Sequence, residues 1–148
     1  MTTVTATTTT TKNVQDRFTS AVKASRQKNQ FRVRVNVMGC CRSCISADHD
    51  ETDKRAYAYA FGGQGMAFTW FEGEMFYREM VNKMKRRNHA HASVRDALQR
   101  SASGRVKVVY FNFDTVEVAQ SLRNAFEAEG FTVEWNGTEE QCVQVVMP

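Results

Sequence analysis

The sequence predicts a single α+β domain, with a mixed, mostly antiparallel sheet of five or six strands and helices on at least one face. Three observations support this fold class. The 148 residues are enough for one continuous core, and 42% of them are apolar, as in globular proteins. Segments that alternate apolar and polar residues mark strands, and amphipathic helical stretches separate them. A strand, a helix and two strands close the chain as a β-α-β-β unit.

Residues 1–11 are nearly all threonine, so we expect a disordered tail before a domain spanning residues 12–148. The next stretch, Lys12 to Gln27, is predicted to be an amphipathic helix with a basic outer face. Its apolar stripe consists of Val14, Phe18, Ala21 and Val22. From Phe31 to Val37, valines alternate with Arg32, Arg34 and Asn36, which predicts a half-buried strand with a basic outer face.

The middle of the chain is predicted to contain a hairpin followed by helices. The strands Ala56–Phe61 and Met66–Phe71 flank the glycine-rich segment 62–65, which is typical of a turn. Residues 74–87 are predicted to form a helix, with Phe76, Met80 and Met84 at intervals of four. Ser93 and Asp96 resemble a capping box that opens a short second helix.

The C-terminal third gives the clearest pattern. Val106–Phe113 is almost continuously apolar, as expected of a central strand covered on both faces. Asp114 and Glu117 predict the start of a helix that ends at Gly130. The following strand is expected to run parallel to the first through a right-handed crossover. A five-residue loop would then set Val133 opposite Val143, which buries more apolar surface than a tight turn at residues 136–137.

The net charge of +4 is unevenly distributed. Residues 1–34 carry seven Lys and Arg against one Asp, and residues 72–107 carry nine against four acidic residues. Residues 110–148 carry one Arg against seven Asp and Glu. Such asymmetry creates a field that steers charged partners. It suits nucleic acid and equally suits self-association into a homo-oligomer, while the acidic third disfavours a protein dedicated to phosphate backbones.

A cysteine-rich run, Gly39 to Cys44, follows the first strand and holds three of the four cysteines. Cys41 and Cys44 have the C-x-x-C spacing that can offer two thiolates to Zn²⁺, and Cys40, His49 and Cys142 are the candidates to complete the site. The histidines His89 and His91 could approach only through tertiary folding. A second metal-binding pair is absent from the sequence, so zinc remains an alternative to cysteines that simply pack at a corner. Thiol redox chemistry is disfavoured, because Arg42 is the sole cation beside the thiols.

The sequence has no apolar run near the roughly 20 residues that span a bilayer, and its start lacks a secretory pattern. We therefore expect a cytoplasmic protein without a membrane partner, in which the thiols stay reduced.

The sequence favours a non-catalytic interaction module, because it contains no complete catalytic motif and predicts no catalytic residue or cofactor. The expected partner is a protein. The candidate contact residues lie on the methionine-bearing, basic helix: Met80, Lys83, Met84, Arg86 and Arg87. The alternative is nucleic-acid binding through the basic segment 78–107 and the strand arginines Arg32 and Arg34, with rings such as Phe31, Trp70 or Tyr77 stacking on bases. Against it, Phe31 belongs to the buried face of its strand, and Trp70 is expected in the core.

Several segments together resemble a family of actinobacterial and actinophage domains of unknown function that share a cysteine-rich knuckle. These are the run at residues 39–44, the strands Tyr57–Phe61 and Val108–Phe113, and the closing Gly130 and Trp135-Asn136-Gly137. The resemblance implies that the cysteine turn and the β-α-β-β unit belong to one fold. A phage origin would fit a small regulatory protein that acts on a host component.

Overall fold

The computed structural model of this protein describes residues 13–37, 52–61 and 67–148. In chain order, the described elements are α2 (Val14–Ser25), β1 (Arg32–Val37), β2 (Tyr57–Phe61), β3 (Phe68–Phe71), β4 (Glu74–Tyr77), α4 (Arg78–Arg87), α5 (His91–Arg100), a short 3₁₀ turn η2 (Ala102–Gly104), β5 (Val108–Phe113), α6 (Val116–Ala128), β6 (Thr132–Glu134) and β7 (Val143–Val146). This confirms the predicted α+β class. The threonine-rich tail and the glycine-rich segment 62–65 lie outside the described residues.

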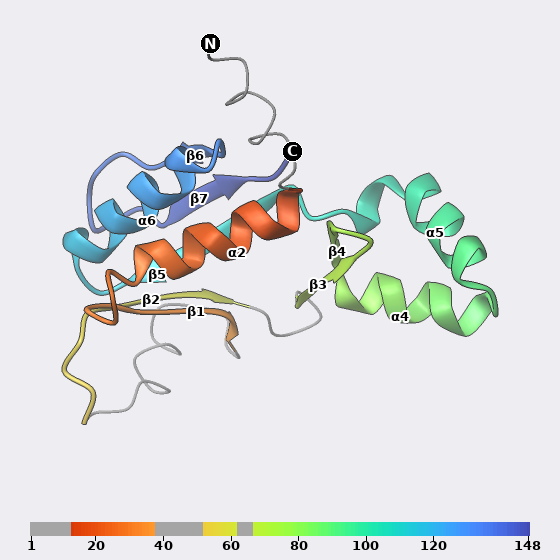
Figure 1. The fold of residues 1–148 in the computed structure, drawn as a ribbon, viewed down its shortest axis with the longest axis horizontal. Helices are drawn as coiled ribbons and strands as arrows, with labels where there is room; N and C mark the ends of the chain where they lie inside the picture. Colours follow the sequence, from red (N-terminus) through yellow and green to blue (C-terminus); the bar gives the residue numbers. More distant parts are fainter. Residues whose placement is uncertain (1–12, 38–51, 62–66) are drawn as a thin grey trace, which may run out of the picture.

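Five of the described strands form one mixed sheet in the order β1-β2-β5-β7-β6 (Figure 1). β1 and β2 run parallel, and the other neighbours run antiparallel. β5 takes the middle position. β5 and β6 point the same way, but β7 lies between them, so the predicted direct pairing of these two strands is wrong. The inserted strand sets Val143 and Val145 opposite Phe111 and Val109, which adds apolar contacts that direct pairing would forgo.

The register of the final hairpin also differs from the prediction. Val133 pairs with Val145 and Glu134 with Gln144, so the connection is longer than five residues. Within it, Trp135 donates from Nε1 to the carbonyl oxygen of Thr138 at 2.9 Å. The ring of Trp135 packs edge-on against Phe113, with 5.9 Å between centroids. Burying the indole in this way requires the wider loop, and the shift of two residues keeps the valines on the same face.

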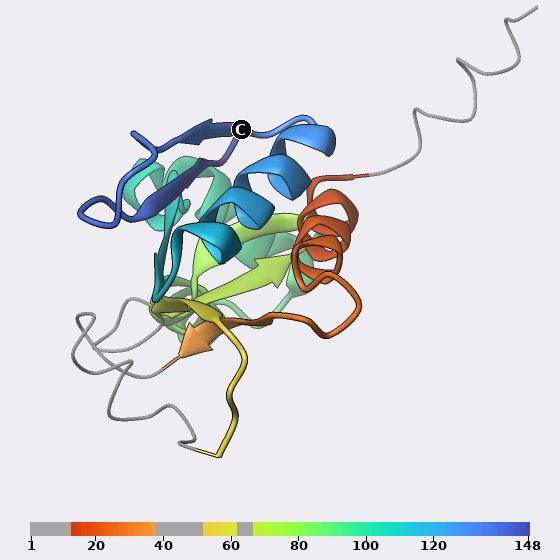
Figure 2. The ribbon, with the colours of Figure 1, turned by 90° about the vertical axis from the view of Figure 1, so that its left-hand side faces the viewer.

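Helices α2 and α6 cover one face of the sheet, side by side (Figure 2). The apolar stripe predicted for α2 is buried there, apart from the half-buried Val14. Phe18 packs edge-on against Phe126 and Phe131, with centroid distances of 5.1 and 6.1 Å. The helix-facing side of the sheet supplies alternate residues of each strand, including Val33, Ala58 and Phe111. This layer is the main core of the domain.

The opposite face of the sheet is more polar. Along β5, Val109, Phe111 and Phe113 are buried, whereas Tyr110 is 51% exposed and Asn112 is half-buried. The prediction that this strand is covered on both faces is therefore wrong. Both described helices that pack on the sheet lie on one side of it. On the other side Tyr110 is exposed, whereas Tyr59 of β2, the partner of Asn112, is buried.

Residues 67–105 form a lobe beside the sheet, at the right of Figure 1. β3 and β4 pair as a separate two-stranded sheet, and α4 and α5 pack beside it. The lobe has its own small core of buried side chains: Phe71, Phe76, Val81, Val94 and Leu98. The lobe is thus a satellite of the main domain with a separate apolar cluster.

The prediction that β2 and β3 pair with each other as a hairpin is wrong. β2 enters the five-stranded sheet between β1 and β5, while β3 turns back through Glu72 and Gly73 to pair with β4. Both turn residues have positive φ, 52° and 78°, as a two-residue hairpin turn requires. Glu74–Tyr77, predicted as the first turn of a helix, is therefore a strand, and α4 begins only at Arg78.

Two predicted helix caps are also corrected. α5 begins at His91 after Ala90, without a side-chain cap, so Ser93 does not open it. α6 is capped by Thr115, whose side chain accepts from the backbone N–H of Val118. Asp114 instead accepts from the backbone N–H of Tyr57 at 2.9 Å, which joins the end of β5 to the start of β2.

Candidate functional site

The two methionines of the predicted contact surface are packing residues. Met80 and Met84 are half-buried and contact the core of the lobe. A Cβ added to Gly104 would lie 2.7 Å from Cγ of Met80, which shows how closely η2 approaches α4. The hydroxyl of Ser101 lies 3.8 Å from the sulfur of Met80. Each methionine therefore offers only part of its side chain beside the basic residues one helical turn further along, Lys83 and Arg87.

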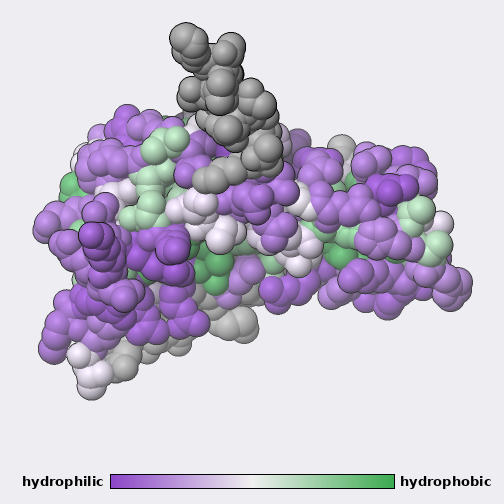
Figure 3. Space-filling model, viewed as in Figure 1, coloured by the Kyte–Doolittle hydropathy of each residue, from purple (hydrophilic) through white to green (hydrophobic). Residues whose placement is uncertain are grey.

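The three predicted basic residues, Lys83, Arg86 and Arg87, are exposed on the solvent side of α4. None of them makes an ion pair with any residue that the structure describes. Lys85 and Arg78 add to the same positive helix, on which Glu79 is the single carboxylate. Figure 3 shows hydrophilic side chains over most of this end of the molecule.

The other carboxylates of the lobe already have cationic partners. Glu72 contacts Nε2 of His91 at 2.6 Å and Nη1 of Arg95 at 3.7 Å. Glu74 pairs with Arg105, and Asp96 pairs with Arg95. The charge of the outward face of α4 is therefore not neutralised by the lobe itself. Lys85, Arg86 and Arg87 lie in the last turn, where the helix dipole favours cations, so the dipole also stabilises this arrangement.

The predicted metal ligands Cys40, Cys41, Cys44 and His49 lie outside the described residues. Cys142 is half-buried just before β7, and His89 and His91 are exposed on the lobe. Among the described residues, no three His, Cys, Asp or Glu side chains converge in a way that could hold a metal ion. The zinc hypothesis therefore stays a prediction.

The aromatic residues predicted to stack on bases are engaged in packing. Phe31 is buried in the main core, and Trp70 and Tyr77 are half-buried against it. The basic segment 78–107 therefore presents its cations without these rings beside them.

A second basic surface, of which the sequence pointed only to Arg32 and Arg34 as candidate contacts, lies at the opposite end of the molecule. Here the C-terminal end of α2 meets the β1 edge and residues 54–55. We call this surface the basic corner, and it comprises Lys23, Arg26, Lys28, Arg32, Arg34, Lys54 and Arg55. The signal for it was the run of cations between residues 23 and 34, which the sequence reasoning divided between a helix and a strand.

Asp53 organises part of the basic corner. Its carboxylate accepts from Nη2 of Arg55 at 2.7 Å and from Nη1 of Arg32 at 3.2 Å. The hydrogen bonds from Arg55, foremost, and from Arg32 hold the pKa of Asp53 well below its usual range. Arg55 also donates to the carbonyl oxygen of Asn29, and Arg26 donates twice to that of Val33. These bonds fix the corner along β1, the outer strand of the described sheet.

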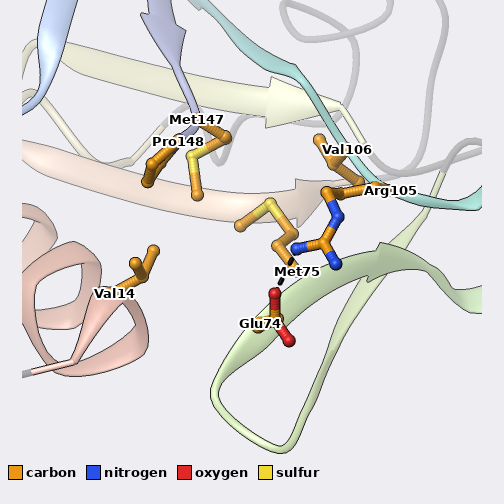
Figure 4. A pocket seen from close by; sticks show the side chains of 7 residues that line it. All are labelled: Val14, Glu74, Met75, Arg105, Val106, Met147 and Pro148. Carbon is orange, nitrogen blue, oxygen red and sulfur yellow. Dashed lines mark hydrogen bonds and ion pairs between the residues drawn. The ribbon is translucent and has the colours of Figure 1, made fainter. Parts of the chain in front are cut away.

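A pocket of about 260 Å³ lies between α2, β4, the start of β5 and the last residues of the chain (Figure 4). Its lining is mostly apolar, with Val14, Met75, Val106 and Met147 around it. The ion pair between Glu74 and Arg105 forms its polar wall, and each charge satisfies the other. The pocket is smaller than the 300–1,000 Å³ typical of ligand sites and holds no nucleophile beside a base.

No helix within residues 13–37 or 67–148 combines the length and the hydropathy that crossing a lipid bilayer requires. Comparison of the chain with protein-family models, with curated proteins and with solved structures gave no match. The resemblance to the cysteine-knuckle domains accordingly stays a prediction.

Proposed function

We propose that this protein is a non-catalytic interaction module that binds an acidic protein surface through the outward face of α4, centred on Lys83, Arg86 and Arg87. The supporting observation is the uncompensated charge of that face: these cations make no ion pair with the described residues, while Glu72, Glu74 and Asp96 are paired. Like charges held together on one exposed face attract and orient an oppositely charged partner.

The chemistry of the face favours recognition by charge. Met80 and Met84 are partly buried against the lobe core, and Phe71 and Phe76 are buried, so the cations, which are fully on the exposed side, dominate this face. Such a surface speeds association more than it slows dissociation, and its affinity falls with salt. Residues 110–148 carry seven acidic residues against one Arg, so a second copy of the chain is one candidate for such an acidic partner.

The test compares the wild type with a variant in which Lys83, Arg86 and Arg87 are all glutamine. Both are applied to immobilised poly-L-glutamate, and the salt concentration that elutes them is measured. The control variant changes the same number of cations to glutamine in the basic corner, at Lys23, Lys28 and Lys54. Earlier elution of the α4 variant alone supports the proposal, whereas equal elution of the α4 variant and wild type contradicts it.

The alternative from the sequence, nucleic-acid binding through residues 78–107, is tested on the same variants with immobilised duplex DNA. If the wild type is retained more strongly on duplex DNA than on polyglutamate, and the α4 variant loses that retention, the partner of α4 is a nucleic acid and not a protein. Sedimentation of the wild type at low salt tests self-association, which should vanish in the α4 variant if a second copy is the partner.

The zinc alternative is tested separately by elemental analysis with thiol titration. Stoichiometric zinc that disappears in Cys44→Ser would support a metal site at the cysteine run, and metal-free folded protein would exclude it.

A further inference from the structure

We propose that the acidic surface bound by α4 belongs to a second copy of this chain, and that it is the connection between β6 and β7. This inference rests on the proposed function and names its partner. Three exposed carboxylates lie at the end of β6 and in the connection that follows: Glu134, Glu139 and Glu140. We call residues 134–140 the acidic loop.

The outward face of α4 and the acidic loop lie at opposite ends of one molecule. Figure 1 shows α4 in the lobe at one end of the long axis, and the blue connection from β6 to β7 at the other. The two surfaces therefore cannot meet within one chain. A contact between them joins unlike surfaces of two copies, as in a heterologous interface.

The charge of the acidic loop is not neutralised by its own part of the chain. Residues 124–148 contain five Glu and neither Lys nor Arg. Arg123, just before them, lies beside Glu127 of its own helix, with 3.6 Å between Nε and Oε2. Glu134 and Glu140 make no ion pair with any residue that the structure describes. The loop thus carries the charge that the outward face of α4 requires of a partner.

Hydrogen bonds from side chains fix the shape of the acidic loop. Trp135 is buried, and its Nε1 donates to the carbonyl oxygen of Thr138 at 2.9 Å. Oδ1 of Asn136 accepts from the backbone N–H and from the hydroxyl of Thr138, at 3.0 and 2.7 Å. The backbone N–H of Asn136 donates to Oε1 of Gln141 at 2.6 Å. Because the backbone that carries the carboxylates is held in this way, less conformational entropy is lost when a partner binds.

The two surfaces have matching charge. Lys83 lies three and four residues before Arg86 and Arg87, so the three cations share one side of α4. Residues 72–107 carry nine Lys and Arg against four acidic residues, while residues 110–148 carry one against seven. The two surpluses are nearly equal and opposite, so contacts between copies offset both of them. An acidic protein of another kind would offset the charge of α4 and leave that of the acidic loop, which favours a second copy as the partner.

The experiment measures association of the full chain, labelled with fluorescein at its N-terminal amino group, by fluorescence anisotropy. A contact made mainly of surface ion pairs is weak, so wild type should bind wild type with a dissociation constant of about 0.1–1 mM at low salt. Binding should vanish at 1 M salt, where the Debye length is about 3 Å. Near-UV circular dichroism checks that each variant below is folded.

Two variants each remove one surface. The α4 variant has glutamine at Lys83, Arg86 and Arg87, and the loop variant combines Glu134→Gln with Glu140→Gln. Each should bind itself about ten-fold more weakly than the wild type does, because two or three ion pairs are lost. The loop variant should bind the α4 variant with the wild-type dissociation constant, because its intact α4 meets the intact acidic loop of the other.

Two control variants remove the same numbers of charges elsewhere, one through glutamine at Lys23, Lys28 and Lys54, the other through Asp16→Asn with Glu127→Gln. Both should self-associate within about three-fold of the wild type, because charges well beyond a Debye length are screened. Loss of association in the lysine control alone would assign the acidic loop to the basic corner and refute the contact with α4.

Two further outcomes would overturn the inference: wild type that stays monomeric at low salt, or a loop variant that binds the α4 variant no better than either binds itself. Retention on polyglutamate separates this inference from the proposed function. Wild type that is retained there through α4 but does not self-associate would refute the second copy as the partner and leave the proposed function standing. Wild type that shows neither property would refute both.

Discussion

The side-chain amide of Asn36 pairs with the backbone of Phe68 as a neighbouring strand would. Nδ2 of Asn36 donates to the carbonyl oxygen of Phe68 at 2.9 Å, and Oδ1 accepts from its N–H at 3.1 Å. Asn36 has a φ of +57° and lies where the register of β1 shifts. One asparagine therefore lies at the irregularity in the pairing of β1 with β2, which resumes at Val37, and ties the five-stranded sheet to the first strand of the lobe.

Substitution of Asn36 is expected to destabilise the folded protein. Asn36→Ala removes both hydrogen bonds and leaves a side chain in the left-handed region, so the free energy of unfolding should fall by about 3 kcal/mol. Asn36→Gly loses the same hydrogen bonds without the backbone strain, so its free energy of unfolding should fall by about 1 kcal/mol less than that of Asn36→Ala. Urea unfolding measures both values. Equal losses in the two variants would mean that the backbone conformation at this position is not strained.

Met80 and Gly104 should show strong energetic coupling. Gly104→Ala places a methyl group 2.7 Å from Cγ of Met80, and such overpacking typically costs 1–3 kcal/mol. Met80→Ala should make room for it, so the double variant should lose less than the sum of the two single losses. A double-mutant cycle from urea unfolding gives the coupling energy. Additive losses would show that Met80 moves away freely, as a surface residue would.

The elements that the sequence predicts best are those whose pattern is local. A few residues suffice to show the helical period of the α2 stripe from Phe18 to Val22 and the strand period from Phe31 to Val35. Both predictions are confirmed. The turn at Glu72 and Gly73 escaped prediction because glutamate rarely takes a positive φ, so Glu74–Tyr77 was joined to the helix that follows.

Which strands pair with each other could not be predicted, since strand pairing depends on residues far apart in the chain. Ala58 and Ala60 fit between β1 and β5 because their small side chains lie fully buried beneath the helices, opposite Phe113 and Phe111. The same limit applied to the candidate sites. Helical spacing placed Met80 on a face of α4 but gave no sign that η2 covers it. The basic corner joins residues 23–34 to residues 54–55, which only folding brings together.

Asp53 should make stability depend on pH in the acid range. Its folded-state pKa lies below the ordinary 3.8, chiefly because of Arg55, so its contribution is present above that value and is lost as pH falls through the folded pKa. Thermal unfolding followed as pH is lowered from 5 should show a smaller loss in Asp53→Asn than in the wild type. Arg55→Gln should behave similarly, and Lys54→Gln should not. A wild-type pH dependence in Asp53→Asn would contradict this assignment.

Tyr59 should be the last of the four tyrosines to ionise. Burial, foremost, raises its pKa above the ordinary 10.0, while the positive charges of Arg32 and Arg34 act in the opposite direction. Alkaline titration of tyrosinate absorbance should therefore show a late step that Tyr59→Phe abolishes and Arg34→Gln moves to still higher pH. Because the unfolded chain loses this proton first, stability should decline as pH rises above 10.0, and the decline should be smaller in Tyr59→Phe. An unmoved late step in Arg34→Gln would mean that the charge of Arg34 does not act on Tyr59, its partner across β1 and β2.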